Sequence, residues 1–290
     1  MQKLFEKTKF KNYRSKKEDW ENKMKILAVD FDGVISDSAF KSLFVSHNAY
    51  CKYYDSKVSK NFDGKLFTFE NWETRKKEYK KEMDYYHRLR SYIELSGDFF
   101  AIIKIMEEQI EIKDQQEFIA YRNQLQFDYH FFRELFFKEK KEWQQKSFKK
   151  WFFLSPVFHE VVKGIQRFLQ EGQKVVIATS NLGEAIHRAF QPEYLGFEMD
   201  IEDIFDKNFG KHKAEHMQAI ANKYGVALED IYFVDDQLSY LRGTDALGVN
   251  VFLAGWGYCT ESQKEEAKKE QIPVIEDEKD FYPVLKKALG

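Results

Sequence analysis

Two pairs of aspartates each follow a short apolar run, and carboxylates placed in this way can do chemistry. Asp30 and Asp32 follow Ile26–Val29, and Asp235 and Asp236 end a similar run. A continuous apolar run of this length is typical of a buried strand in a parallel sheet. The carboxyl ends of such strands form the edge at which open α/β sheets bind ligands. A carboxylate at that edge can hold a hard cation, attack an electrophile or move a proton.

The first pair lies in the sequence Asp30-Phe31-Asp32-Gly33. Carboxylates two residues apart on a strand point to the same face, and a glycine after them lets the chain turn close to a bound group. By themselves the same residues would also suit a strand-end turn that caps a helix. The functional interpretation therefore depends on what the rest of the chain brings to the same edge.

The segments that must position these carboxylates alternate between apolar strands and amphipathic helices. The predicted elements are helices at 157–170, 183–190, 213–224 and 279–289, and further strands at 174–181 and 230–237. Such alternation indicates βαβ units and a parallel sheet. We therefore predict an α/β fold with a Rossmann-like parallel sheet, built from residues 24–37 and 155–290.

Residues 38–154, which interrupt this core, differ from it in composition. They contain none of the four prolines and only two glycines, and charged segments such as Glu73–Glu82 favour helix. Apolar residues also recur at helical spacing, as from Phe99 to Met106. We predict an inserted all-α unit in which many of the aromatic residues form a core or a cleft. The lysine-rich residues 1–23 are predicted to be an N-terminal extension.

Composition excludes several classes of function. With 290 residues, 43% hydrophobic content and a net charge of −2, the chain can bury a sizeable core and shows no general affinity for nucleic acid. It has no apolar run of about 18 residues that would span a membrane. The two cysteines, Cys51 and Cys259, fit a reducing compartment. We expect a cytoplasmic protein, monomeric or homodimeric, that binds neither nucleic acid nor membrane.

The segment Asp30–Ser38 resembles the first motif of the haloacid dehalogenase-like superfamily of phosphatases and related hydrolases, and the later motifs occur in the required order. The second motif is a Thr or Ser at a strand end, and it falls on Thr179, with Ser180 and Asn181 beside it. A hydroxyl and backbone N–H groups at a helix entrance suit a phosphate oxygen. An ordinary helix cap is the alternative for these residues taken alone.

The third and fourth motifs supply a lysine and an acidic pair. The lysine of the third motif lies at the start of a helix, which leaves Lys213 and Lys211 as candidates, and we favour Lys213. The fourth motif falls on Asp235 and Asp236. Two adjacent acids at the end of a buried strand would repel each other strongly without a cation.

The resemblance implies a Mg²⁺-dependent phosphatase that forms an aspartyl-phosphate and acts on a small phosphorylated metabolite. Asp30 would be the nucleophile, Asp32 the general acid and base, and Thr179 and Lys213 would hold the phosphoryl oxygens. The implied phosphate-binding residues are Gly33, Thr179, Ser180, Asn181, Lys211 and Lys213. The implied metal site consists of Asp30, Asp32 through its backbone carbonyl, Asp235 and Asp236. In this family a helical insertion after the first motif is a cap, called C1-type, and residues 38–154 would be an enlarged version of it.

One departure from the family pattern and several alternatives remain. The commoner fourth motif has another acid four residues on, where this chain has Tyr240. A phosphomutase would keep all four motifs, a phosphonatase would need a Schiff-base lysine from the cap, and a non-catalytic binding protein could retain the core. Asp32 argues against a dehalogenase, which does not use a second aspartate. Polar cap residues that could contact a leaving group are His47, His87, Arg88, Arg90 and Glu94.

Overall fold

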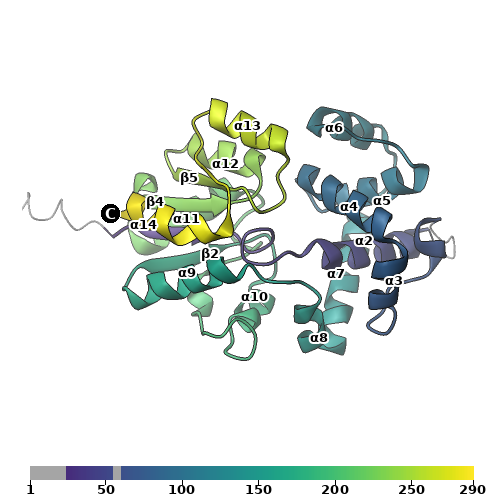
Figure 1. The fold of residues 1–290 in the computed structure, drawn as a ribbon, viewed down its shortest axis with the longest axis horizontal. Coiled ribbons are helices and arrows are strands. Elements are labelled where there is room, and N and C mark those ends of the chain that lie inside the picture. The colour runs from purple at the N-terminus through teal and green to yellow at the C-terminus, as the bar shows by residue number, and fades with distance from the viewer. Residues whose placement is uncertain (1–23, 55–59) are drawn as a thin grey trace, which may run out of the picture.

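A parallel β-sheet with helices on both faces organises the protein (Figure 1). The computed structural model describes residues 24–54 and 60–290. Within these residues six strands form one sheet in the order β3-β2-β1-β4-β5-β6, and every neighbouring pair is parallel. The strands are β1 (Ile26–Val29), β2 (Lys174–Ala178), β3 (Ile204–Phe205), β4 (Ile231–Asp235), β5 (Asn250–Ala254) and β6 (Val274–Ile275). The predicted α/β class with a parallel sheet is confirmed, whereas the predicted extension at 1–23 lies outside the described residues.

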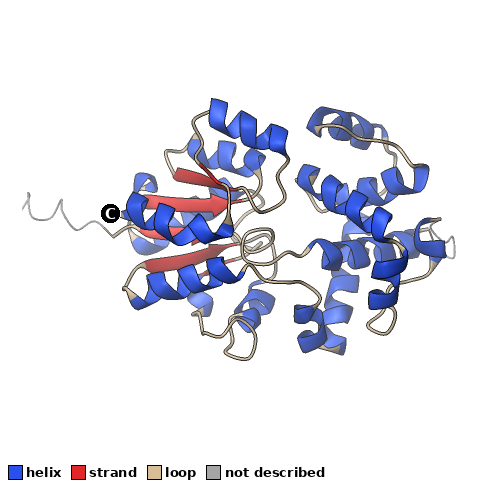
Figure 2. Cartoon of the chain, in the orientation of Figure 1, coloured by secondary structure: helices blue, strands red, loops and turns tan. Residues whose placement is uncertain are grey.

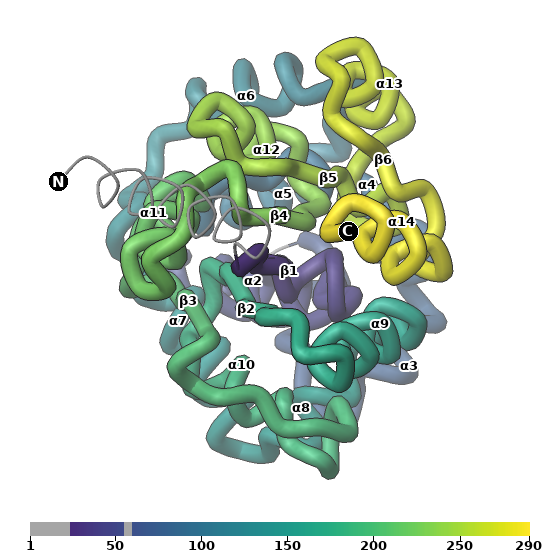
Figure 3. Tube along the Cα trace, turned by 90° about the vertical axis from the view of Figure 1, so that its left-hand side faces the viewer, coloured from purple at the N-terminus to yellow at the C-terminus, as the bar shows by residue number. Residues whose placement is uncertain are grey.

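The central strand β1 is buried on both faces, as its uninterrupted apolar sequence predicts. Leu27 and Val29 belong to the cluster that includes α9 and α14, and Ile26 and Ala28 belong to the cluster that includes α11 and α12. Figure 3 shows these two helix pairs on opposite sides of the sheet. The helices around the sheet are α9 (His159–Gln170), α10 (Gly183–Ala189), α11 (Lys213–Tyr224), α12 (Leu238–Asp245), α13 (Glu261–Lys269) and α14 (Phe281–Leu289).

The order in which strands are added to the sheet changes direction beside β1. The chain runs outward from β1 to β2 and β3 on one side, and then resumes at β4 on the other side. In sheets of this kind a crevice forms outside the carboxyl ends of the two strands that flank the reversal. Asp30 follows β1 and Asp235 ends β4, so the topology brings both pairs of aspartates to this crevice.

A helical insertion, residues 39–153, lies beyond the carboxyl ends of the strands (Figure 1). Its described residues contain no strand, as Figure 2 shows. Its α-helices are α2 (Ala39–Tyr53), α3 (Trp72–Glu78), α4 (Lys80–Leu89), α5 (Asp98–Glu108), α6 (Gln115–Gln124), α7 (Tyr129–Lys146) and α8 (Phe148–Phe153). Aromatic side chains make much of its interior: the Phe44 ring stacks on Phe67 with centroids 4.4 Å apart, and Phe100 stacks on Phe127 at 4.2 Å.

The helical structure predicted for Glu73–Glu82 is confirmed on both sides of Tyr79, where the chain breaks between α3 and α4. This residue has φ −109° and ψ 37°, outside the helical region. Its ring packs against Phe62 with centroids 5.4 Å apart, and its hydroxyl donates to Asp63. The tertiary contacts of one aromatic residue thus override the local helix preference. Among the helices of the described segments, none combines the length and apolarity needed to cross a bilayer.

The short 3₁₀ turns complete the described fold. They are η1 (Asn61–Gly64), η2 (Arg90–Tyr92), η3 (Ile201–Asp203), η4 (Leu228–Asp230) and η5 (Glu278–Asp280). Of these, η2 is the one that matters for the site, because it presents Arg90 to the space between the sheet and the insertion.

Candidate active site

Asp30 lies where β1 ends and is 7% exposed. Its backbone N–H donates to the carbonyl of Val234 at 3.0 Å, which continues the sheet by one residue and fixes the position of the side chain. The chain then turns at Gly33, which has φ +88° and whose N–H donates to Ser36 at 2.8 Å. That φ lies in the left-handed region, where glycine is the residue with the least strain.

Two glycines also let three chain segments meet at this point. A Cβ atom added at Gly33 would overlap the carboxylate of Asp236, and one added at Gly257 would overlap the Cβ of the same residue. The Asp236 carboxylate accepts the backbone N–H of Tyr258 at 2.7 Å. The turn after β1, the end of β4 and the segment after β5 therefore hold Asp236 in one place.

Lys213 joins the two strand-end acids. Its Nζ lies 2.7 Å from Oδ1 of Asp30, 3.2 Å from Oδ2 of Asp235 and 2.6 Å from the carbonyl oxygen of Ala178. The start of α11 is held by Glu215, whose carboxylate accepts the backbone N–H of His212 at 3.1 Å. An acid in the first turn of a helix is favourable for this role.

The two candidate lysines have different surroundings. Lys213 is 3% exposed and reaches Asp30, whereas Lys211 is exposed and lines the outer cavity. The backbone N–H of Lys211 donates to Glu215. The structure thus brings Lys213, and not Lys211, to the carboxylates.

Burial and mutual repulsion dominate the electrostatics of the acids. Burial raises the pKa of Asp30 to about 7, although Lys213 opposes the shift. Burial also raises the pKa of Asp235, and burial together with the charges of Asp235 and Asp30 raises the pKa of Asp236 well above its usual value. Asp30 and Asp235 raise the pKa of Lys213 despite its burial. Lys213 thus contacts two of the three buried acids, and Asp236 interacts with the charge of Arg90 instead.

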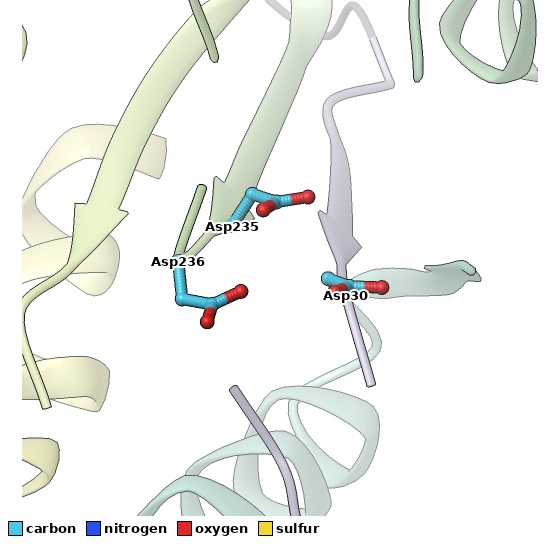
Figure 4. A group of neighbouring side chains, drawn as sticks. All are labelled: Asp30, Asp235 and Asp236. Atoms are coloured by element: carbon cyan, nitrogen blue, oxygen red, sulfur yellow. The ribbon is translucent and has the colours of Figure 1, made fainter. Parts of the chain in front are cut away.

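Asp30, Asp235 and Asp236 form a group that could hold a metal ion (Figure 4). Each offers an oxygen atom, and these atoms lie within 4.8 Å of one another. Oδ2 of Asp235 is buried, and within the described part of the chain its one close polar partner is Nζ of Lys213, at 3.2 Å. An all-oxygen, negatively charged donor set suits a hard divalent cation such as Mg²⁺. The residues therefore fit the metal that the resemblance implies.

Asp32 points elsewhere. Its carboxylate accepts a hydrogen bond from the side-chain amide of Asn181, and it is not part of the group of three acids. The oxygen of the same amide accepts from Nζ of Lys140, which belongs to α7 of the helical insertion. A chain of polar contacts therefore runs from the insertion to Asp32.

The loop after β2 places its three polar residues differently. Thr179 is fully buried, does not line the cavity, and accepts the N–H of Asn181 on its hydroxyl at 3.1 Å. Ser180 is exposed, and it lines the cavity together with Asn181. The hydroxyl of Thr179 therefore orients the residue that contacts Asp32.

A cavity of about 540 Å³ lies between the sheet edge and the helical insertion. Asp30, Asp32 and Asp236 line it from the sheet. Cations from the insertion line it as well, among them Lys41, Arg90 and Lys140. The volume is in the usual range for a small-molecule site.

The leaving-group candidates in the insertion divide into two sets. Arg90 and Glu94 line the cavity. His87 and Arg88 are exposed outside it, and His47 is fully buried against the Phe62 ring, with centroids 5.0 Å apart.

Tyr240 occupies the position at which the commoner fourth motif has an acid. Its ring lies 5.8 Å from Nζ of Lys213, and it lines the cavity. Its hydroxyl donates to the backbone carbonyl of Glu94 in the insertion. A residue that would be an acid in the common pattern therefore links the sheet to the insertion.

Sequence reasoning missed Lys41, Lys140 and the contact of Asp236 with the segment at Gly257 and Tyr258. The two lysines carry no signal, because the insertion is rich in lysine throughout. The Trp256–Tyr258 sequence is distinctive, but only the fold shows that it touches Asp236.

Sequence relatives are partial matches. Enolase-phosphatase E1 of Salmo salar is 33% identical over 97 residues, which cover 33% of this chain and 37% of that protein. Enolase-phosphatase E1 of Danio rerio is 27% identical over 131 residues, which cover 44% of this chain and 46% of that protein. The chain therefore matches less than half the length of these relatives.

Solved structures with a similar fold cover nearly the whole chain. A predicted phosphoglycolate phosphatase from Haemophilus somnus has a TM-score of 0.56 at 15% identity, over 91% of this chain and 98% of that one. A hydrolase from Pseudomonas syringae has a TM-score of 0.54 at 16% identity, over 92% and 100%. The model of a family of hydrolases, described as haloacid dehalogenase-like hydrolase, matches residues 24–241. Three quarters of the chain thus match that family, and the protein belongs to the haloacid dehalogenase-like hydrolases.

Proposed function

We propose that this hydrolase is a Mg²⁺-dependent phosphatase that cleaves a small-molecule phosphate monoester through an aspartyl-phosphate on Asp30. One observation carries the proposal: the contact of Lys213 with Asp30, inside a buried group of carboxylates that opens onto the cavity. Two carboxylates, a lysine and a hydroxyl-bearing loop are what phosphoryl transfer needs at one point. The helical insertion would act as the cap that closes over a small phosphorylated metabolite.

Asp30 is the nucleophile in this mechanism. An oxygen of its carboxylate attacks phosphorus, and the bond from phosphorus to the ester oxygen breaks. Lys213 favours the ionised form of Asp30, because its ammonium opposes the rise in the carboxyl pKa that burial causes. The loop Thr179–Asn181 and Lys213 hold the phosphoryl oxygens, on which negative charge develops.

Asp32 moves the protons. It gives a proton to the departing alcohol oxygen, and it then takes one from the water that attacks the aspartyl-phosphate. This second attack releases inorganic phosphate and restores the Asp30 carboxylate. The hydrogen bond from Asn181 supports this role, because it fixes the carboxylate at the cavity wall.

Asp30, Asp235 and Asp236, with the backbone carbonyl of Asp32, would hold the Mg²⁺ ion. The ion, when bound, offsets the repulsion between the phosphate and the carboxylates and so supplies electrostatic stabilisation. The close approach of three buried carboxylates, whose oxygen atoms lie within 4.8 Å of one another, supports this assignment. Cys51 and Cys259 form no disulfide, which supports the proposed cytoplasmic location.

A specific observation favours phosphonatase as a second candidate. Burial lowers the pKa of Lys41 to about 8, and this lysine is 8% exposed at the cavity wall. A lysine with a depressed pKa can form a Schiff base with a carbonyl substrate. Borohydride trapping with an aldehyde phosphonate would label Lys41 in a phosphonatase, and the absence of a label would exclude it.

Release of inorganic phosphate tests the main proposal. The protein would be assayed with para-nitrophenyl phosphate and a panel of metabolite phosphates, with Mg²⁺ and with EDTA. We expect Mg²⁺-dependent release that falls by at least about 10³-fold in Asp30→Asn, because the amide cannot act as the nucleophile.

Asp203→Asn is the matched control. Asp203 also pairs with a lysine, since its carboxylate lies 2.6 Å from Nζ of Lys174, but it precedes β3 at the opposite edge of the sheet. We expect this variant to keep most of the activity. Release that survives in Asp30→Asn, or no release from any ester by a folded protein that binds Mg²⁺, would contradict the proposal.

A further inference from the structure

Three of the cations that the helical insertion contributes to the cavity, Lys41, Arg90 and Lys140, form no salt bridge with an acid of the described residues. We propose that the leaving group of the substrate carries a second anionic group, a carboxylate or a second phosphate, which Lys41, Arg90 and Lys140 bind. This inference rests on the proposed phosphatase function and specifies its substrate class. The anion is the shared chemistry, and the two sources are separated by the test below.

Lys41 is a buried ammonium group that Asp32 and Asp37 attract from a distance but that forms no salt bridge with the described residues. It lies on α2, it lines the cavity, and among the described residues no carboxylate oxygen lies within 4 Å of its Nζ and no hydrogen bond is made by it. Its neighbours are the rings of Trp151 and Phe152, both 5.5 Å away. An ammonium group buried against aromatic rings loses hydration that a bound anion could replace.

Arg90 repeats this pattern from η2. Its guanidinium packs on the ring of Tyr258 at 4.6 Å and on that of Phe99 at 5.5 Å. Its buried Nε has no hydrogen-bond partner in the described part of the chain. Since a guanidinium matches the planar geometry of carboxylates and phosphates, an oxyanion in the cavity would satisfy it.

Lys140 places the cluster on the leaving-group side of the site. Its Nζ donates to Asn181, and the amide of Asn181 in turn donates to Asp32. Burial lowers the pKa of both Lys41 and Lys140, and attraction to Asp32 opposes the shift in each case. Asp32 is the residue that protonates the departing oxygen in the proposed mechanism, so cations gathered near it flank the leaving group.

Lys213 has a different position. It bonds directly to Asp30 and the Ala178 carbonyl, and in the proposed mechanism it holds the transferring phosphoryl group. The transferring group thus already has its lysine and its metal ligands. The cations of the insertion remain for an anion elsewhere on the substrate.

Calorimetric binding to the full chain with Mg²⁺ tests the inference without requiring turnover. The probes are propylphosphonate, its ω-carboxylate analogue and the corresponding bisphosphonate. We expect at least one of the two analogues that carry a second anionic group to bind about tenfold more tightly than propylphosphonate, as a charge-assisted contact would give. The tighter of the two identifies the second anion as carboxylate or phosphate.

Lys41→Met and Arg90→Met should reduce this preference to about twofold, since each removes one charge-assisted contact. Lys104→Met is the matched control and should retain it, because Lys104 lies on α5, pairs with Glu107 and Glu108, and does not line the cavity. Thermal unfolding of each variant confirms that it is folded.

Two results would overturn the inference. One is equal binding, or no binding, of all three probes by the wild-type protein. The other is an equal loss of affinity for all three probes in Lys41→Met and Arg90→Met, which would mean that the cations bind the transferring group itself. A preserved preference without phosphate release from any ester would instead overturn the proposed function alone.

Discussion

The sheet edge and the helical insertion differ in whether their buried charged side chains have partners. At the sheet edge, Lys213 contacts two carboxylates and a carbonyl, and Asp236 accepts a backbone N–H. In the insertion, Lys41 and Arg90 lie against aromatic rings without an acidic partner among the described residues. Charges that are paired within the fold suit a reaction common to many substrates. Charges left without a partner suit a group that a particular substrate brings.

The largest expected difference between the two regions is in stability. Without Mg²⁺, Lys213→Met should lower the free energy of unfolding by about 3–5 kcal/mol, because it leaves buried acids without their cation. Lys41→Met should leave it unchanged or raise it by about 1 kcal/mol, because the variant removes a buried charge that has no partner. Urea unfolding followed by circular dichroism measures both.

An equal loss of unfolding free energy in both variants would contradict this comparison. Lys41 would then have a counter-ion that stabilises the fold as much as the acids around Lys213 do. Mg²⁺ sharpens the comparison. A cation that replaces part of the charge of Lys213 should restore stability to Lys213→Met and should not affect the difference between Lys41→Met and the wild type.

The pH dependence of stability isolates the contribution of Asp30. Its pKa rises on folding from 3.8 to about 7, so the native state binds more protons than the unfolded state between these values. The stability of the metal-free protein should therefore fall as pH rises from about 4 to 7, by roughly 4 kcal/mol from this group, and level off above. Denaturant unfolding across this pH range gives the slope.

Asp30→Asn separates this effect from the other carboxylates. The variant lacks the titrating group, so its stability should fall less over the same interval and should exceed that of the metal-free wild type near pH 7.5. An unchanged slope would mean that another group causes the dependence. Saturating Mg²⁺ should flatten the wild-type profile, because a bound cation favours the ionised carboxylate.

How much of this could be read from the sequence differs between the same two regions. The strands that end at Asp30 and Asp235, and the helix that begins at Lys213, follow from short apolar runs and local caps, and α11 has the predicted bounds. Parallel pairing then places their ends together. The α/β class was predicted for this reason, the family was predicted from the resemblance of its motifs, and both are confirmed.

The insertion could be predicted to be helical, but its contribution to the cavity could not. Lys41 and Lys140 are separated by about a hundred residues in a segment full of lysines, and nothing local distinguishes them. Their juxtaposition depends on how α2 packs on α7, which is a matter of aromatic packing. Tyr240 is intermediate: the sequence marks it as a departure from the pattern, whereas only the structure shows its contact with Glu94.

The smallest expected effect concerns this link between the two regions. Tyr240→Phe removes the hydroxyl that donates to the backbone carbonyl of Glu94, and it keeps the ring that lines the cavity. The lost hydrogen bond should cost about 1 kcal/mol. If the bond holds the insertion over the site, KM should rise about threefold while kcat changes little, because the weakened contact lowers the population of the closed form.

Tyr85→Phe is the matched control for Tyr240→Phe. Tyr85 also donates its hydroxyl to a backbone carbonyl, that of Ile110, but both residues belong to the insertion. The two variants therefore lose the same kind of bond, and only one of them loses a contact between the insertion and the sheet. A rise in KM for Tyr240→Phe alone would assign the link to substrate capture. An equal rise for both would mean that the stability of the insertion, and not its attachment, sets the affinity.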